Sequence, residues 1–191
     1  MLGRTKKREA DSPEAVPCPD PGLDPETGLI GAGRFEEIVA RQISRDLRYG
    51  STTSLALFEI GVAENSVDGP IPSPAPFVAK VLTKAVRGAD VVARVAPALF
   101  AVLLIEADQN GATQFTERAR TRIGSSPYAR RADGGGLYAR AWAAVIPWTP
   151  ELDSVDLYAG AAERALAATF RGYEAAQAWF RGEGVNKPFI A

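Results

Sequence analysis

The stretch Asp90-Val91-Val92-Ala93-Arg94-Val95-Ala96-Pro97-Ala98-Leu99-Phe100-Ala101-Val102-Leu103-Leu104 holds two apolar runs on either side of a short turn that contains a proline. Runs of β-branched and aromatic residues that are separated by a turn favour a β-hairpin. We therefore expect residues 90–96 to pair with residues 99–106. The turn of this hairpin is the reference point from which the other elements are counted.

The composition is that of an ordinary globular chain. Its 191 residues are 46% hydrophobic and 24% charged, which is enough for one substantial core and a tail. The formal net charge of −1 argues against a partner recruited by bulk charge, although local basic clusters are compatible with it. From this charge we expect no nucleic-acid partner and no membrane insertion.

The chain has one cysteine, Cys18, and no histidine. A single cysteine excludes an internal disulfide, and the missing histidines exclude histidine-based catalysis and the usual zinc sites. No run reaches the roughly 20 apolar residues of a membrane helix, and the basic start lacks the apolar core of a signal peptide. We expect a cytoplasmic protein whose Lys6, Lys7 and Arg8 belong to a solvated tail.

Residues 1–23 are rich in proline, charged and small residues and predict a flexible leader, so that residues 24–191 form one domain. Periodicity and turn residues within that domain alternate between helical and extended segments, which indicates helices packed on one antiparallel or mixed sheet. Helices are expected at 34–49, 77–86, 108–123 and 155–180, and strands at 53–62, 90–96, 99–106 and 137–148. Asp108 can cap the third of these helices.

Three local details follow from the same patterns. Gly88 stands where a left-handed helix cap is expected, and four prolines make residues 64–76 a loop. The run Gly134-Gly135-Gly136 predicts a flexible turn. The buried side of the last helix is expected to carry Leu157, Ala161, Leu166 and Phe170.

The order of these elements resembles that of the GGDEF domain of diguanylate cyclases. Residues 24–29, Asp-Pro-Glu-Thr-Gly-Leu, are similar to the opening Asp-x-Leu-Thr-Gly-Leu of that family. Residues 96–100, Ala-Pro-Ala-Leu-Phe, stand where the family has Gly-Gly-Asp/Glu-Glu-Phe. The resemblance spans roughly residues 24–175 and implies an α/β (α+β) fold of the nucleotide cyclase palm type, with a central, mainly antiparallel five-stranded sheet flanked by helices.

The resemblance also implies that the reaction of the family has been lost. Making cyclic di-GMP from two GTP molecules needs carboxylates that hold two magnesium ions. Glu59 and Gly61 stand at the two acidic positions of the first long strand, and Ala98 and Leu99 replace the acids of the hairpin. Pro97 has no N–H to offer a phosphate. We therefore expect no enzymatic activity, catalytic residue, metal site or cofactor.

Other positions that contact the substrate in the family have changed as well. Phe170 and Glu174 stand where the resemblance places a phosphate-binding lysine and arginine, and Pro72 stands near the guanine-reading aspartate. Glu59 is left as a polar residue on an apolar strand. It is either a relic of the metal site or the partner of a nearby arginine.

The inhibitory site of the family, Arg-x-x-Asp, is retained at its spacing of five residues before the hairpin turn. It binds the product, and here it reads Arg87-Gly88-Ala89-Asp90. Arg118 matches an arginine that the next helix contributes to the same site. Arg45 matches one that comes from a neighbouring domain, with Arg48 as a nearby substitute. The resemblance thus implies a cyclic di-GMP site made of Arg87, Gly88, Asp90, Arg118 and, from a second subunit, Arg45.

Each of these residues also has a purely structural interpretation. A cation is favourable at the end of a helix, an aspartate is common in turns, and Arg118 can lie on a solvated helix face. From the full pattern we predict a catalytically inactive cyclic di-GMP receptor that signals through altered self-association, as a homodimer, or through binding of another protein. The alternative is an interaction module that ignores nucleotides, with Trp179 and Phe180 as a natural contact surface.

Overall fold

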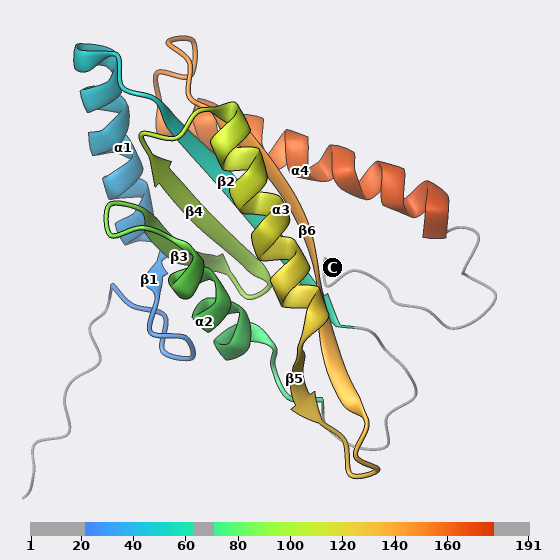
Figure 1. Cartoon of the computed structure of the whole chain (residues 1–191). Helices are drawn as coiled ribbons and strands as arrows, with labels where there is room; N and C mark the ends of the chain where they lie inside the picture. The colour runs from blue at the N-terminus through green and yellow to red at the C-terminus, as the bar shows by residue number, and fades with distance from the viewer. Residues whose placement is uncertain (1–21, 63–70, 178–191) are drawn as a thin grey trace, which may run out of the picture.

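The computed structural model describes residues 22–62 and 71–177, which form one six-stranded sheet with helices on both faces (Figure 1). The strand order is β1-β3-β4-β2-β6-β5; β1 pairs parallel with β3, and every other pairing is antiparallel. In chain order the elements are β1 (Ile30–Gly31), α1 (Ala32–Tyr49), β2 (Thr53–Val62), α2 (Ala75–Ala85), β3 (Val91–Ala96), β4 (Leu99–Ile105), α3 (Gln109–Ser125), β5 (Pro127–Arg130), β6 (Gly136–Pro147) and α4 (Val155–Gln177).

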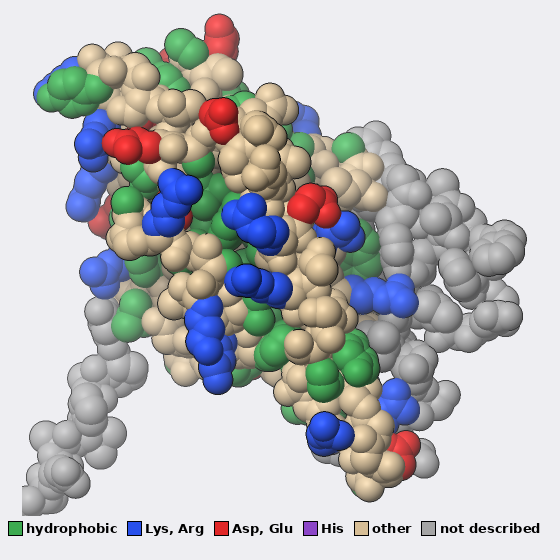
Figure 2. Space-filling view, viewed as in Figure 1, with side chains coloured by type: hydrophobic (Ala, Val, Ile, Leu, Met, Phe, Trp, Pro, Cys, Tyr) green, Lys and Arg blue, Asp and Glu red, His purple; other side chains and the backbone are tan. Residues whose placement is uncertain are grey.

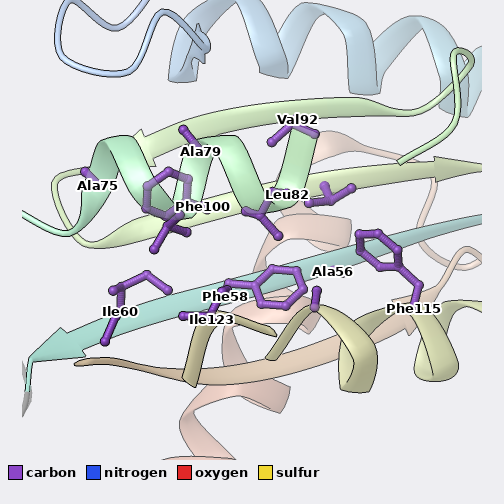
Figure 3. Packing of buried hydrophobic residues seen from close by; sticks show 14 of the residues in the cluster. Ala56, Phe58, Ile60, Ala75, Ala79, Leu82, Val92, Phe100, Phe115 and Ile123 are labelled. Atoms are coloured by element: carbon purple, nitrogen blue, oxygen red, sulfur yellow. The ribbon is translucent and has the colours of Figure 1, made fainter. Parts of the chain in front are cut away.

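The central strand β2 is buried over its whole length and pairs with β4 on one side and β6 on the other. Because side chains alternate along a strand, its two faces supply two separate cores. Leu55 and Leu57 pack with α1 and α4, whereas Phe58 and Ile60 pack with α2 and α3. In the second of these cores, the ring of Phe58 meets that of Phe115 edge to face at 6.2 Å (Figure 3).

The structure confirms the α+β class and the mainly antiparallel sheet, with six strands in place of five. The hairpin of β3 and β4, strand β2, and the α3 cap at Asp108 also lie where the sequence predicts them. Two strands were missed. Strand β1 has only two residues, too few to show a pattern. Strand β5 begins at Pro127 and ends at Arg130, and its four residues show no apolar alternation that could mark a strand. Gly134, with φ of 86°, makes the turn that joins β5 to β6.

Two local predictions are wrong. Gly88 is not in a left-handed conformation, because α2 ends at Ala85 with Val86 as an extended cap. The buried face of α4 carries Leu166, as predicted, but it carries Tyr158 in place of Leu157, which is 48% exposed. Many residues of α4 are alanines, so the apolar pattern is flat and does not mark which side is buried. The Tyr158 hydroxyl donates to main-chain carbonyls of the sheet, and burial raises the pKa of this phenol.

Most of the predicted leader, residues 1–21, lies outside the described residues. Its last two residues, Gly22 and Leu23, pair with Gly31 and Ile30 at the start of the fold. Among the described residues, no helix is both long and apolar enough to cross a membrane.

A buried arginine ties the opening turn of the domain to the β3–β4 hairpin. The Arg94 guanidinium, only 10% exposed, donates to Asp24 at 3.0 Å and to Glu26, and it also donates to the carbonyl of Pro97 at 2.7 Å. Burial disfavours the charged form of Asp24, but hydrogen bonds from Thr27 and Arg94 outweigh it and hold its pKa below the usual 3.8. These contacts join segments about 70 residues apart.

Glu26 is held in its charged form by the same cluster. Hydrogen bonds from Ser73 and from Arg94 hold its pKa below the usual 4.5. Carboxyl groups whose pKa is lowered by folding stabilise the folded state above their unfolded pKa values. That contribution is lost as the pH falls below about 4.5 and then through the lower values of the folded chain.

We expect Arg94→Ala to lower the free energy of unfolding at pH 7 by about 2 kcal/mol, because two carboxylates and a carbonyl lose a buried charged donor. The variant should also lose less stability than the wild type as the pH falls from 6 to 3, because its carboxyl pKa values are closer to those of the unfolded chain. Urea unfolding at several pH values measures both effects.

Arg41→Ala is the matched control, because its pair with Glu37 is exposed and costs no more than about 0.5 kcal/mol to remove. Equal effects of the two substitutions, or an unchanged pH dependence in Arg94→Ala, would contradict the role given to Arg94.

Candidate functional site

The predicted Arg-x-x-Asp motif forms the tight turn between α2 and β3. The N–H of Asp90 donates to the carbonyl of Arg87 at 3.1 Å, which closes a four-residue turn directly after the cap of α2. Gly88 lies in this turn, exposed, with open space where a Cβ would stand. The structure therefore brings Arg87, Gly88 and Asp90 together in one loop at the start of the hairpin.

The carboxylate of Asp90 is engaged with the main chain on both oxygens. Oδ2 accepts the N–H of Arg87 at 2.8 Å, and Oδ1 accepts the N–H of Ile105 at 3.0 Å. The side chain thus closes its own turn and fastens it to the end of β4. A carboxylate has about four acceptor positions, so each oxygen keeps one for a ligand.

The two arginines of the predicted site lie on the same face of the sheet as each other. Arg87 follows α2, Arg118 lies in the middle of α3, and α2 and α3 pack side by side there (Figure 1). Both residues are exposed, and neither guanidinium makes a hydrogen bond or ion pair with the described part of the chain. Arg120, two residues further along α3, is instead paired with Glu117 at 2.7 Å.

Arg45 and its predicted substitute Arg48 lie on α1, across the sheet from Arg87 and Arg118. The buried side of α1 packs in the core with Leu55 and Leu57, whereas α2 and α3 cover the opposite face. Within one chain, Arg45 therefore does not join the other residues of the predicted site. Its expected place in the site of a second subunit stays a prediction.

Hydrogen bonds to two of its carbonyls hold the hairpin turn between β3 and β4. Ile60 donates its N–H to the carbonyl of Ala98 at 2.9 Å, and Arg94 binds the carbonyl of Pro97. Beside this turn lies a pocket of about 340 Å³, lined mostly by apolar residues from the end of β2, the segment before α2 and the hairpin. Among its described lining residues are Ile60, Val62, Ile71, Pro72, Pro97 and Phe100.

Glu59 and Gly61, at the two positions where the resemblance predicts acids, lie in an apolar setting on β2. Glu59 is only 6% exposed, its carboxyl group makes no hydrogen bond or ion pair with the described residues, and burial raises its pKa. It pairs with Trp142 across the ladder to β6, and the ring of Trp142 covers Gly61. A Cβ on Gly61 would meet two ring atoms at 2.7 and 2.9 Å. The contact of Trp142 with Gly61 depends on the register of β2 and β6, which a linear pattern does not give.

Several predicted residues cannot be placed further. Phe170 and Glu174 lie in α4 beyond Thr169, where side chains are no longer described, and Trp179 and Phe180 lie outside the described residues. Within residues 22–62 and 71–169, no group of three or more acidic, cysteine or histidine side chains could hold a metal ion.

Comparison with known proteins identifies the fold. No protein-family model and no curated protein sequence matches the chain. Among solved structures, the GGDEF domain of TpbB (YfiN) from Pseudomonas aeruginosa matches with a TM-score of 0.68 and 19% identity, over 78% of this chain and 89% of that one. The GGDEF domain of DgcB from Caulobacter crescentus, solved in complex with cyclic di-GMP, matches with a TM-score of 0.66 and 18% identity, over 80% and 92%.

A third match is diguanylate cyclase SiaD from Pseudomonas aeruginosa, solved in complex with its activator SiaC. The TM-score is 0.67 at 20% identity, over 78% of this chain and 58% of that one. At these identities the likeness concerns the backbone arrangement, and it covers nearly the whole of the isolated GGDEF domains. The chain has the GGDEF-domain fold.

Proposed function

We propose that this chain is a catalytically inactive receptor for cyclic di-GMP, which binds the dinucleotide through Arg87, Asp90 and Arg118. The observation that carries the proposal is the Arg87–Asp90 turn. It is held in place by the Asp90 carboxylate, it lies on the same face as Arg118, and the guanidinium groups of Arg87 and Arg118 have no partner in the described chain. A structural neighbour with the same fold, DgcB, was solved with cyclic di-GMP.

The residue types suit the ligand. A guanidinium can donate two hydrogen bonds to the O6 and N7 edge of a guanine or to a phosphate. Asp90 keeps acceptor positions that can take the N1–H and N2–H of a guanine. Two cations and one carboxylate can in this way hold the bases and phosphodiesters of a cyclic dinucleotide.

Three features support the absence of cyclase activity. Glu59 has no second acid beside it on the strand, because residue 61 is a glycine, and the ring of Trp142 fills the place of a side chain there. The hairpin turn offers Pro97, which lacks an N–H, and its carbonyl is held by Arg94. The neighbouring pocket is apolar, and its Arg94 is already neutralised by Asp24 and Glu26. The residues present do not fit a pair of magnesium ions or a triphosphate.

The output of the receptor is a change in self-association or in the binding of another protein. Arg45 is exposed on the opposite face, so it can reach a bound dinucleotide only on a neighbouring copy. Among the structural neighbours, SiaD was solved with an activator protein. Light scattering with and without cyclic di-GMP distinguishes a change in self-association from binding of a separate partner.

Calorimetric titration with cyclic di-GMP should show binding by the wild type and a loss of about tenfold to hundredfold in affinity for Arg87→Ala or Arg118→Ala. Each substitution removes one bidentate contact, worth about 1–3 kcal/mol. Arg87→Lys should also bind weakly, because an ammonium keeps the charge but not the planar fork.

The matched control is Arg41→Ala, which removes an exposed arginine from α1 and should bind like the wild type. Absence of binding by the wild type, or unchanged binding by Arg87→Ala and Arg118→Ala, would overturn the proposal. That result would favour the alternative of an interaction module that ignores nucleotides.

Asp90→Ala should lower the free energy of unfolding by about 2 kcal/mol even without ligand, because the N–H groups of Arg87 and Ile105 lose their acceptor. Urea unfolding measures this loss. Asp133→Ala is a suitable comparison, because that carboxylate accepts from Gly135 in an exposed turn and should cost about 0.5 kcal/mol. An Asp90→Ala variant as stable as the wild type would contradict the structural role of this carboxylate.

Purified protein with GTP and magnesium should form no cyclic di-GMP, as measured by chromatography.

The covering of Gly61 can be tested by urea unfolding of variants. Gly61→Ala should lower the free energy of unfolding by about 2 kcal/mol, because the added Cβ overlaps the ring of Trp142. In a Trp142→Ala background the same substitution should cost much less. Magnesium-dependent product formation, or an equal cost in both backgrounds, would contradict this account.

A further inference from the structure

The exposed side of α2 and α3 carries a concentration of cations that the net charge of the chain conceals. Five exposed side chains belong to it, and we call this set the α2–α3 basic face: Lys80, Lys84, Arg87, Arg118 and Arg122. Figure 2 shows Lys and Arg side chains gathered over these two helices. Whereas the whole chain has a formal charge of −1, these five residues alone carry five positive charges.

Acidic side chains do not neutralise this face. Helix α2 contains no acidic residue, and the single acid of α3, Glu117, is paired with Arg120. None of the five charged side-chain groups makes a hydrogen bond or ion pair with a side chain in the described part of the chain. Asp90, three residues after Arg87, is bound instead by the main-chain N–H groups of Arg87 and Ile105. Glu106 and Asp108 lie before α3, about 15 Å of helix away from Arg118 at 1.5 Å per residue.

The cations are arranged in rows along the helices. Lys80 and Lys84 are one turn apart on α2, and Arg118 and Arg122 are one turn apart on α3, so each row repeats at about 6 Å. A hollow of about 290 Å³ lies beside Lys80 and Lys84 and is also lined by Thr83. Rows of cations with a hydroxyl between them can contact successive phosphates of a chain.

The remaining exposed residues of the face decide which polyanion fits best. Its uncharged members, Thr83, Gln114 and Thr121, are polar and can donate hydrogen bonds to phosphate oxygens. It exposes no aromatic side chain for the stacking that single strands require, and no large apolar one for insertion into a lipid surface or as the anchor of an acidic peptide. These features match the sugar-phosphate backbone of a double-stranded nucleic acid.

We propose that the α2–α3 basic face binds the phosphate backbone of duplex DNA without reading its sequence. The expectation of no nucleic-acid partner rests on the charge of the whole chain, whereas binding depends on the charge of the contacting face. Lys80, Lys84 and Arg122 lie outside the proposed dinucleotide site, while Arg87 and Arg118 belong to both. Cyclic di-GMP and the duplex therefore compete, and the dinucleotide releases the nucleic acid.

The test is fluorescence anisotropy of the full chain with a labelled duplex of arbitrary sequence at salt concentrations from 50 to 200 mM. Five phosphate contacts give a slope of about −4.5 in log K against log salt, which is a loss of about 500-fold over that range. Lys80→Ala/Lys84→Ala removes two contacts, so the loss should fall to about 40-fold. Arg41→Ala/Arg164→Ala removes the same charge from α1 and α4 and should behave like the wild type.

Several results would overturn the proposal. These are absence of duplex binding at 50 mM salt, equal slopes for the two double variants, or binding to vesicles with 30% phosphatidylserine but not to the duplex. Calorimetry separates this inference from the receptor function, because Lys80→Ala/Lys84→Ala should bind cyclic di-GMP as the wild type does. Duplex binding without dinucleotide binding would reject the receptor alone, and dinucleotide binding without duplex binding would reject this inference alone.

Discussion

Strand β2 is enclosed on all four sides by other parts of the fold, and the rest of the structure is arranged around it. It hydrogen-bonds to β4 and β6 along both edges and is covered by a core on each face. A strand in this position is mostly apolar on both faces, because a polar or charged side chain there would lose its contact with water. Thr53 and Ser54 at its start are polar, but their hydroxyls are hydrogen-bonded to Gln42 and to the carbonyl of Ala107. Glu59 is the one ionisable residue of the strand, and its raised pKa reflects the cost of keeping a charged carboxylate there. The positions of the hairpin, of the α2–β3 turn and of the basic face all follow from pairing with this strand.

Much of this arrangement can be predicted from local pattern. The bounds of β2 and the α3 cap at Asp108 were correct because alternation, capping residues and turns act over a few residues. The errors also have physical causes. The alanines of α4 left its buried face ambiguous, so that Tyr158 was missed, and the short β5 is held by its pairing with β6 rather than by its own apolar pattern. Edge strands of this sort depend on their neighbour more than on their composition.

For the candidate site, spacing predicted the turn but not how it is held. Asp90 accepts from Ile105, which lies 15 residues further along the chain, and only the pairing of β3 with β4 brings the two together. The covering of Gly61 by Trp142 likewise depends on the register of two strands that are far apart in sequence. The basic face is a third case, because its lysines and arginines come from separate helices and are diluted in the overall charge. A linear pattern does not show which residues lie close together in the folded sheet.

The contacts of Arg94 have a consequence for the dynamics of the domain. Strand β1 has only two residues and pairs with only one other strand, β3, so the ladder contributes little to holding residues 22–31 in place. The side chain of Arg94 holds this segment instead, by binding Asp24 and Glu26. The opening segment can therefore detach as a cooperative unit while β2 and its two cores stay folded. Amide hydrogens there exchange with solvent through this local opening, whereas those of β2 exchange only when the whole domain unfolds.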